Sequence, residues 1–261
     1  MKSFNYKSAT NTKDASKLIS GRAAFLAGGM SLLPAIKLRL AAYTDLVDIK
    51  KIKGLSGIKV SSKSLKIGAT TTHAEVAVSN EVNKSIASLA ILAEGIGDPQ
   101  VRNRGTIGGS IANNDPAADY PSACLALNAT IHTNKRKIPA EKFFKGMFET
   151  DLKKGELIEA IEFEVPEKSS YIKYPNPASR YAIVGVYVAK FKKEVRVSIT
   201  GAASSVFRFK ELEAALTSNF SPSVVENINI SSKELNSDIH ASAEYRAHLI
   251  KVMTRKAVSS C

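Results

Sequence analysis

Two segments with paired glycines constrain the fold of this chain more than any other feature. The segment AGGMSL spans residues 27–32 and TIGGS spans residues 106–110, and each lies where an apolar helix can begin. Paired glycines let the backbone turn with positive φ and approach a ligand closely, and a helix start aims free N–H groups at an anion. Either segment alone is typical of an ordinary strand-to-helix turn. Two in one chain favour a second interpretation, in which they grip the two halves of a pyrophosphate.

The common nucleotide-binding motifs do not occur at these loops. Neither loop matches the G-x-G-x-x-G pattern of dinucleotide-binding folds or the G-x-x-x-x-G-K-[ST] pattern of the P-loop. Ser31 and Ser110 follow the glycines, and each hydroxyl can either donate to the ligand or cap a helix N-terminus. The two glycine loops therefore predict an anion-binding site without identifying the ligand.

Charged residues surround the second glycine loop within GDPQVRNRGTIGGSIANNDPAADYPS, residues 97–122. Asp115 and Asp119 can accept hydrogen bonds from the hydroxyls of a ribose or ribityl chain, or they can cap the next helix. Arg102 and Arg104 can bind phosphate, dock a partner, or brace the loop against Asp98 or Asp115. The sequence does not decide between these roles.

The chain carries no catalytic centre of its own that the sequence reveals. Its two cysteines, Cys124 and Cys261, have no partners at the spacing of a zinc or iron–sulfur site, and its four histidines are far apart. We expect Cys124 to be a small buried hydrophobic residue and His73 to cap or pack against a helix. Any redox chemistry must therefore come from a bound organic cofactor, and no metal is expected.

Apolar periodicity divides the chain into three units that mix helices and strands, at residues 1–53, 54–166 and 167–261. The first is predicted to contain a helix over residues 12–19, strands in AAFLAGG and LVDI, and a helix in SLLPAIKLRLA. The second is predicted to contain short strands and helices on both sides of TIGGS. The third is predicted to begin with the strands YAIVGVYVAKF and EVRVSITGAA and to end in helices, which is typical of an α+β domain.

The net charge of the chain is +13, from 37 Lys and Arg against 24 Asp and Glu. The basic residues are scattered and are not interleaved with aromatic side chains, so we expect no nucleic-acid partner and favour docking to acidic protein subunits. No segment has the apolar length of a signal peptide or of a membrane span. We therefore expect a cytoplasmic protein with no integral membrane segment, which can lie peripherally at the inner face of the membrane through its complex.

The chain resembles the FAD-binding medium subunits of the molybdenum hydroxylases, such as the flavoprotein subunits of carbon monoxide dehydrogenase and xanthine dehydrogenase. The resemblance rests on four segments that follow one another along the chain. They are FLAGGMSLLPAIKLRLAAYTDLVDI, IGATTTHAEV, GDPQVRNRGTIGGSIANNDPAADYPSACLAL and YPNPASRYAIVGV. It implies the vanillyl-alcohol-oxidase-type (PCMH-type) fold, in which two α/β subdomains hold FAD and a C-terminal domain of antiparallel sheet and helices follows.

The resemblance also implies which residues bind FAD. Both glycine loops wrap the pyrophosphate, Asn113 and Asp119 bind further polar atoms, Lys173 lies near the pyrimidine end of the isoalloxazine ring, and Tyr181 lies against the ring. A cation there stabilises the negative charge of reduced flavin. The alternative roles are a solvated lysine for Lys173 and a core tyrosine for Tyr181. The implied cofactor-binding residues are Leu26, Ala27, Gly28, Gly29, Met30, Ser31, Leu32, Val101, Thr106, Ile107, Gly108, Gly109, Ser110, Asn113, Asp115, Asp119, Ile158, Lys173 and Tyr181.

By the same resemblance, the chain is the electron-transfer subunit of a larger oxidoreductase. It implies a large partner subunit with a molybdopterin cofactor and a small subunit with two [2Fe–2S] clusters, assembled as a dimer of heterotrimers. Electrons pass from those clusters to FAD and on to a quinone, NAD or oxygen. Two alternatives are a stand-alone flavin oxidase or dehydrogenase of the same fold and a non-redox nucleotide-binding scaffold protein. The substrate of the complex, its acceptor and the role of the two arginines are not determined by the sequence.

Overall fold

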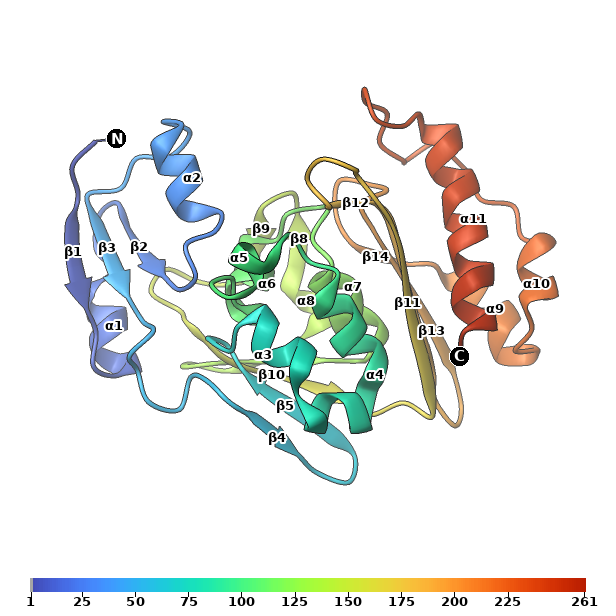
Figure 1. The fold of residues 1–261 in the computed structure, drawn as a ribbon, viewed down its shortest axis with the longest axis horizontal. Helices are drawn as coiled ribbons and strands as arrows, with labels where there is room; N and C mark the ends of the chain where they lie inside the picture. The colour runs from blue at the N-terminus through green and yellow to red at the C-terminus, as the bar shows by residue number, and fades with distance from the viewer. Residues whose placement is uncertain (1) are drawn as a thin grey trace.

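The computed structural model describes residues 2–261, which contain four β-sheets, of which one is a two-stranded hairpin and the other three follow one another along the chain (Figure 1). These three sheets take their strands from residues 5–48, 58–164 and 168–208. The predicted domain boundaries at 53/54 and 166/167 fall between these sheets. The mixture of helices and strands agrees with the predicted α+β class.

The first sheet has three parallel strands in the order β1-β3-β2, and Asp45 pairs with both Asn5 and Ala23. Asn11 caps the first helix by accepting a hydrogen bond from the Asp14 N–H at 2.9 Å. Leu46 and Val47 of the central strand are fully buried. The elements are β1 (Asn5–Ser8), α1 (Thr12–Leu18), β2 (Ala23–Leu26), α2 (Leu32–Lys37) and β3 (Asp45–Asp48).

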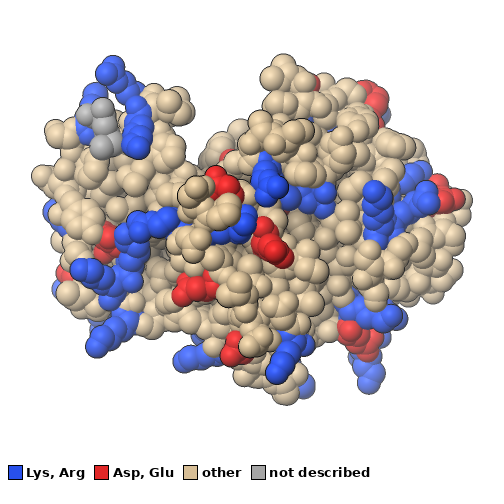
Figure 2. All heavy atoms as spheres, viewed as in Figure 1, with Lys and Arg blue, Asp and Glu red and all other residues tan. Residues whose placement is uncertain are grey.

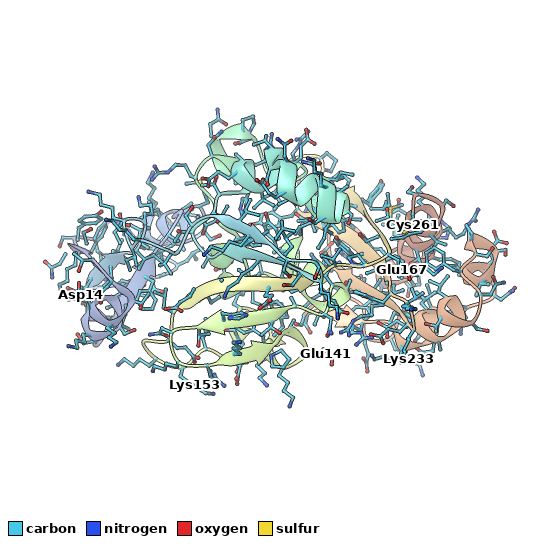
Figure 3. The ribbon with its side chains drawn as sticks, turned by 90° about the horizontal axis from the view of Figure 1, so that it is seen from below. Asp14, Glu141, Lys153, Glu167, Lys233 and Cys261 are labelled. Atoms are coloured by element: carbon cyan, nitrogen blue, oxygen red, sulfur yellow. The ribbon has the colours of Figure 1, made fainter. Side chains whose placement is uncertain are left out.

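The second sheet has five antiparallel strands in the order β4-β5-β10-β6-β7, and helices cover one of its faces (Figure 1). Figure 3 looks onto the other face, where the strands are seen directly. The helical face is buried in the largest core of the protein. The strands are β4 (Ile58–Val60), β5 (Ser64–Gly68), β6 (Thr130–Thr133), β7 (Lys137–Pro139) and β10 (Ile158–Glu164). The helices are α3 (His73–Val78), α4 (Asn80–Glu94), α5 (Pro99–Arg102), α6 (Ile107–Asn113), α7 (Tyr120–Ala126) and α8 (Ala140–Phe143).

A small hairpin extends from this unit and is tied to the end of α6. Its strands are β8 (Phe144–Gly146) and β9 (Glu149–Thr150). The buried Asn114 adopts a left-handed backbone and donates from its side-chain amide to the carbonyls of Gly146 and Glu149, at 2.8 Å each. This hairpin could not be predicted from the sequence, because its strands are very short and their anchor is a tertiary contact.

The third sheet is antiparallel, in the order β11-β12-β13-β14. Its two central strands are buried along almost their whole length, because α4 and α7 pack against one face and the C-terminal helices against the other. This double coverage explains the continuous apolar run of β12, and it also buries the polar side chains that alternate with the apolar ones along β13. The elements are β11 (Lys168–Pro175), β12 (Ala182–Lys190), β13 (Val195–Thr200), β14 (Phe207–Arg208), α9 (Lys210–Ser218), α10 (Pro222–Glu226) and α11 (Ala243–Ser259).

Within residues 2–261, no helix has the length and apolarity needed to cross a bilayer. Cys124 is fully buried in the core of the second unit, which confirms its predicted packing role.

Candidate cofactor-binding site

A cavity of about 490 Å³ lies between the N-terminal unit and the rest of the chain. Its walls come from all three units, including the AGGMSL loop, the TIGGS loop, and Ser179 to Tyr181 at the turn between β11 and β12. The surface is hollowed between the N-terminal lobe and the larger lobe (Figure 2). The volume lies within the usual range of small-molecule and cofactor sites.

The AGGMSL loop leaves the end of β2 and offers free backbone donors to the cavity. In the part of the chain that the structure describes, the N–H groups from Gly28 to Leu32 donate to no protein acceptor. Ser31 occupies the N-cap position of α2 but makes no capping hydrogen bond through its side chain. Its hydroxyl and the loop N–H groups are therefore available to an anionic ligand.

Gly28 joins this loop to the second unit. A Cβ atom placed on Gly28 would collide with the backbone carbonyl of Arg104, so only glycine allows the two segments to pack this closely. The first glycine of the AGGMSL loop thus has a packing role, in addition to any contact with a ligand.

The TIGGS loop differs from the first loop, because its backbone donors are already used. Thr106 caps α6 by accepting from the Gly109 N–H at 3.1 Å, and the Gly108 N–H donates to the Ala69 carbonyl at 2.9 Å. The N–H groups of Ile107 and Ser110 likewise donate to the carbonyls of Thr71 and Thr106. The expected alternative of Ser110 as a helix cap is wrong, since Thr106 is the cap.

The two glycines of the TIGGS loop face different surroundings. A Cβ on Gly108 would lie 2.5 Å from the Cβ of Ala69, which shows that Gly108 packs against the sheet. A Cβ on Gly109 would meet the Thr106 hydroxyl at 2.9 Å and then the Ala27 Cβ at 3.9 Å, across the cavity. Gly109 therefore keeps the space between the two loops open.

Asp119 forms a buried charged cluster at the cavity wall. Its carboxylate accepts hydrogen bonds from the Tyr171 hydroxyl and from Lys173 Nζ, the latter at 3.1 Å, and the same Nζ donates to the Gly95 carbonyl at 2.8 Å. Burial raises the pKa of the Asp119 carboxyl, while the Lys173 charge and the Tyr171 hydrogen bond oppose that rise. The alternative of helix capping by Asp119 is wrong, because its side chain makes no capping bond.

Neither Lys173 nor Tyr181 fits the alternative role considered for it from the sequence. The Lys173 side chain is only 10% exposed, so it is not a solvated lysine, and it touches Asp119 rather than the cavity. Tyr181 is 43% exposed and lines the cavity, so it is not a core tyrosine. Burial, together with Asp115 and Asp119, raises the pKa of the Tyr181 phenol, which keeps it protonated.

The two arginines beside the TIGGS loop have separate roles. Arg102 Nη1 donates to the carbonyls of Ile96 and Gly97, at 3.0 and 3.1 Å. Arg102 therefore braces the loop after α4, but it does so through carbonyl oxygens rather than through Asp98 or Asp115. Arg104 is exposed, and it contributes to the site through its backbone carbonyl against Gly28.

Most of the predicted cofactor-binding residues meet around this one cavity. Leu26, Ile107 and Lys173 are the exceptions: Leu26 and Ile107 are core residues, and Lys173 lies behind Asp119. Predicted residues that line the cavity are Ala27, Gly28, Gly29, Met30, Ser31, Leu32, Val101, Thr106, Gly108, Gly109, Ser110, Asn113, Asp115, Asp119, Ile158 and Tyr181.

His73 is a cavity residue that the sequence interpretation did not place there. Its ring is 5% exposed and packs against Tyr120, with ring centroids 5.4 Å apart, whereas the helix cap is its neighbour Thr72. Burial, and then the Arg102 charge, lower the pKa of His73 to about 4. The sequence signal was present in GATTTHAEV, but only the tertiary packing shows that this histidine reaches the cavity.

Glu156 also lines the cavity and was not predicted. Burial disfavours its charge, but hydrogen bonds from the Arg136 side chain, the Lys153 N–H and Thr133 outweigh it and lower its pKa to about 2. This carboxylate is therefore fully ionised and already paired. Among residues 2–261, no three His, Cys, Asp or Glu side chains lie close enough together to hold a metal ion.

Comparison with known proteins identifies two matching families. Residues 2–167 match the family described as the FAD binding domain in molybdopterin dehydrogenase, and residues 169–261 match the CO dehydrogenase flavoprotein C-terminal domain. The glyceraldehyde dehydrogenase medium chain of Sulfolobus acidocaldarius is 37% identical, over 97% of this chain and 96% of the relative. Subunit alpha of the 6-hydroxypseudooxynicotine dehydrogenase complex of Paenarthrobacter nicotinovorans is 30% identical, over 98% and 94%.

The fold is shared with a solved structure over almost the whole chain. It is the carbon monoxide dehydrogenase of Hydrogenophaga pseudoflava, in a form that lacks the molybdenum–pyranopterin moiety of its molybdenum cofactor. The TM-score is 0.88 and the sequence identity 31%, over 98% of this chain and 96% of that one.

Proposed function

Because the chain belongs to the family of FAD-binding subunits of the molybdenum hydroxylases, we propose that its cavity holds FAD with the pyrophosphate between the AGGMSL and TIGGS loops. One observation carries this assignment. The two paired-glycine loops, far apart in the sequence, face each other across a single cavity.

The residues present fit such a ligand, but the two loops contribute differently. The AGGMSL loop presents free N–H groups, which suit the oxygens of a pyrophosphate. The TIGGS loop offers the open surface at Gly109 together with the hydroxyls of Thr106 and Ser110. We therefore assign anion binding mainly to the first loop and close approach mainly to the second.

The remaining residues position the other parts of the cofactor. Asn113 and Asp115 would hold hydroxyl groups, and Tyr181 would lie against the isoalloxazine ring. Lys173 would act through Asp119, because its ammonium group holds that carboxylate at the cavity wall. This role modifies the sequence-based expectation of a direct Lys173 contact with the flavin.

The protein is a subunit of an oxidoreductase, and its redox chemistry belongs to the cofactor. The chemistry that FAD supplies when bound is the transfer of electrons from the [2Fe–2S] clusters of a partner subunit to an external acceptor, a quinone, NAD or oxygen. Relatives named for glyceraldehyde, 6-hydroxypseudooxynicotine and carbon monoxide share this chain's fold or sequence over nearly its whole length. We infer that the substrate is selected by the molybdopterin-bearing subunit and not by this chain.

The same family membership supports a proposal for the assembly. The relatives are medium chains or subunits of larger enzymes. We propose a heterotrimer with a molybdopterin-binding large subunit and a [2Fe–2S] small subunit, paired into a dimer of heterotrimers.

The assignment is tested by replacing Gly109, whose side chain would point between the loops. The variant Gly109→Leu should bind FAD at least about tenfold more weakly, because its side chain would fill the space between the two loops that the ligand needs. Gly146→Leu is the matched control, since a Cβ there meets nothing closer than 3.6 Å and the residue lies away from the cavity. Visible flavin absorption after gel filtration gives the bound fraction, and circular dichroism reports folding. A folded Gly109→Leu protein that retains full FAD would refute the pyrophosphate assignment.

A further inference from the structure

The His73 side chain is buried at the wall of the cofactor cavity and makes no hydrogen bond to the protein. Its ring is 5% exposed and lines the cavity together with Gly105 and Val101. Within residues 2–261, Nδ1 is sealed from solvent without a hydrogen-bond partner, and Nε2 has no protein partner either. Buried polar groups in native proteins are nearly always hydrogen-bonded, so this imidazole lacks a partner that the protein itself does not supply.

The backbone holds the ring against the start of the TIGGS loop. The His73 N–H donates to the Gly105 carbonyl at 3.0 Å. On the other side of Thr72, the Ile107 N–H donates to the Thr71 carbonyl at 3.1 Å. A Cβ on Gly105 would lie 2.6 Å from His73 Nε2, so only glycine lets this edge of the ring reach the loop. The Nε2 edge of His73 is therefore fixed at the loop that contacts the pyrophosphate in the proposed function.

The surroundings of the ring place its proton on Nε2. Nδ1 is sealed among protein atoms that offer it no acceptor, and a buried N–H without an acceptor is rare in native proteins. Since a neutral imidazole has one donor and one acceptor nitrogen, Nδ1 carries the lone pair and Nε2–H is left to donate.

The neighbours of His73 keep it neutral in the absence of a ligand. Burial, and then the charge of Arg102 on α5, lower the pKa of His73 to about 4. The other titratable group packed against the ring is Tyr120 of α7, whose ring centroid lies 5.4 Å away. The ring is therefore a neutral donor at pH 7.

The TIGGS loop needs a donor of this kind. The N–H groups of residues 107–110 all donate to protein oxygens, so the backbone of the loop has none of these donors left for an anion. The hydroxyls of Thr106 and Ser110 and the Nε2–H of His73 remain beside it. A phosphate group that leaves water needs hydrogen bonds to its oxygens. His73 supplies a donor where the backbone of the loop does not.

We propose that His73 is a further ligand of the cofactor, and that its neutral imidazole donates from Nε2 to a pyrophosphate oxygen beside the TIGGS loop. This inference rests on the proposed function, because it names a contact of the same ligand. It accounts for the unpaired buried ring, which the cofactor satisfies. An anionic oxygen beside the ring also stabilises its protonated form, so binding of the cofactor should raise the pKa of His73.

NMR of the chain labelled with ¹⁵N-histidine tests this contact without an enzymatic assay. The His73 signals are identified by their absence from the spectrum of His73→Gln. In the ligand-free protein, we expect a neutral ring with its proton on Nε2 and a pKa of about 4. Addition of FAD should shift the Nε2 signal and raise this pKa by at least about one unit, which corresponds to about tenfold tighter FAD binding by the protonated form.

Fragments of the cofactor distinguish a contact with phosphate from a contact with the flavin ring. ADP carries a diphosphate without a flavin, and it should shift the His73 signals in the same direction as FAD. Riboflavin carries the ring without phosphate, and it should leave these signals unchanged. A shift produced by riboflavin and not by ADP would place His73 at the isoalloxazine ring and overturn the proposed contact.

Substitution of His73 measures what the donor contributes. His73→Leu removes both ring nitrogens and retains a side chain of similar size, so it should bind FAD at least about tenfold more weakly, because a hydrogen bond to a charged group is lost. His73→Gln retains a side-chain N–H and should bind within about threefold of the unchanged protein. His248→Leu, at an exposed position on α11, is the control and should bind FAD as the unchanged protein does. Fluorescence titration gives the dissociation constants, and circular dichroism reports folding.

The outcomes separate this contact from the proposed function. If FAD binds to the unchanged protein without altering the His73 signals, the contact is refuted and the FAD assignment stands. Equal FAD affinity of folded His73→Leu and the unchanged protein leads to the same conclusion. Failure of the unchanged protein to bind FAD would refute the proposed function and the contact together.

Discussion

The neutral, buried His73 makes the stability of this protein depend on pH well above the range in which carboxylates titrate. His73 is 5% exposed, and burial followed by the Arg102 charge lowers its pKa from 6.5 to about 4. Since its pKa is lower in the folded than in the unfolded chain, acid favours unfolding. The stabilisation is complete above about pH 6.5 and is lost as the pH falls towards about 4.

The size of the effect follows from the two pKa values. A pKa lowered by about 2.5 units corresponds to a stabilisation of about 3.4 kcal/mol, which is lost completely only well below pH 4. By pH 5, about 2 kcal/mol of this stabilisation has been lost. That is a large share of the unfolding free energy of a typical folded domain, which is about 10 kcal/mol. Carboxylates whose pKa is lowered by folding contribute little over this interval, because their unfolded pKa values lie near 4. Asp119, whose pKa is raised by burial, and His132, whose pKa is lowered by burial, change the stability in opposite directions as the pH falls.

Urea denaturation of the cofactor-free protein at pH 7 and pH 5 measures this loss directly. We expect the free energy of unfolding of the unchanged protein to fall by about 2 kcal/mol between the two pH values, and that of His73→Gln to fall by less than about 0.5 kcal/mol. His240→Gln, at an exposed position, is the control and should retain the full pH dependence. If His73→Gln and the unchanged protein showed the same loss, the assignment of this pH dependence to His73 would be refuted.

Two further substitutions test contacts at the cavity wall. Lys173→Met should destabilise the protein by about 3 kcal/mol at pH 7, because it leaves the buried Asp119 carboxylate without its cation, and Lys173→Met/Asp119→Asn should recover most of this loss in urea denaturation. Because burial raises the pKa of an unpaired Asp119, the penalty of Lys173→Met should shrink as the pH is lowered; a constant penalty would contradict the model of an unpaired charge. Gly28→Ala should lower stability by about 2 kcal/mol and weaken FAD retention, because its Cβ collides with the Arg104 carbonyl, and an unchanged melting temperature would show that the loops can separate at no cost.

The elements that could be predicted from the sequence are those whose pattern reflects burial within one segment. The continuous apolar run of β12 marks a strand covered on both faces, the alternating apolar residues of β13 mark a second strand, and α1, α3 and α11 begin at recognisable polar caps. The strands β1 and β11 were missed, because β1 is a short edge strand with mostly exposed residues and β11 carries several polar side chains. Their position is set by pairing with β3 and β12 rather than by their own composition.

The cofactor site shows the same division between local and tertiary information. The glycine loops were visible as local motifs, because paired glycines have few roles other than tight turns and close approach. The unequal use of their backbone donors was not visible, since it depends on Ala69 and Thr71 accepting from the second loop. The placement of Lys173 behind Asp119 likewise depends on the approach of β11 to the start of α7.

The cavity also explains how the N-terminal unit is held to the rest of the protein. Its apolar contact with the second unit is small, and Leu55 and Leu157 are the residues of that unit that enter the buried cluster around Val47 and Ile49. The contact of Gly28 with the Arg104 carbonyl adds a close backbone approach at the cavity itself. A ligand that binds both glycine loops bridges the same two units, and at a hundred times its dissociation constant it adds about 2.7 kcal/mol to the stability of the folded state. Binding the cofactor and holding the N-terminal unit against the rest of the protein are therefore coupled.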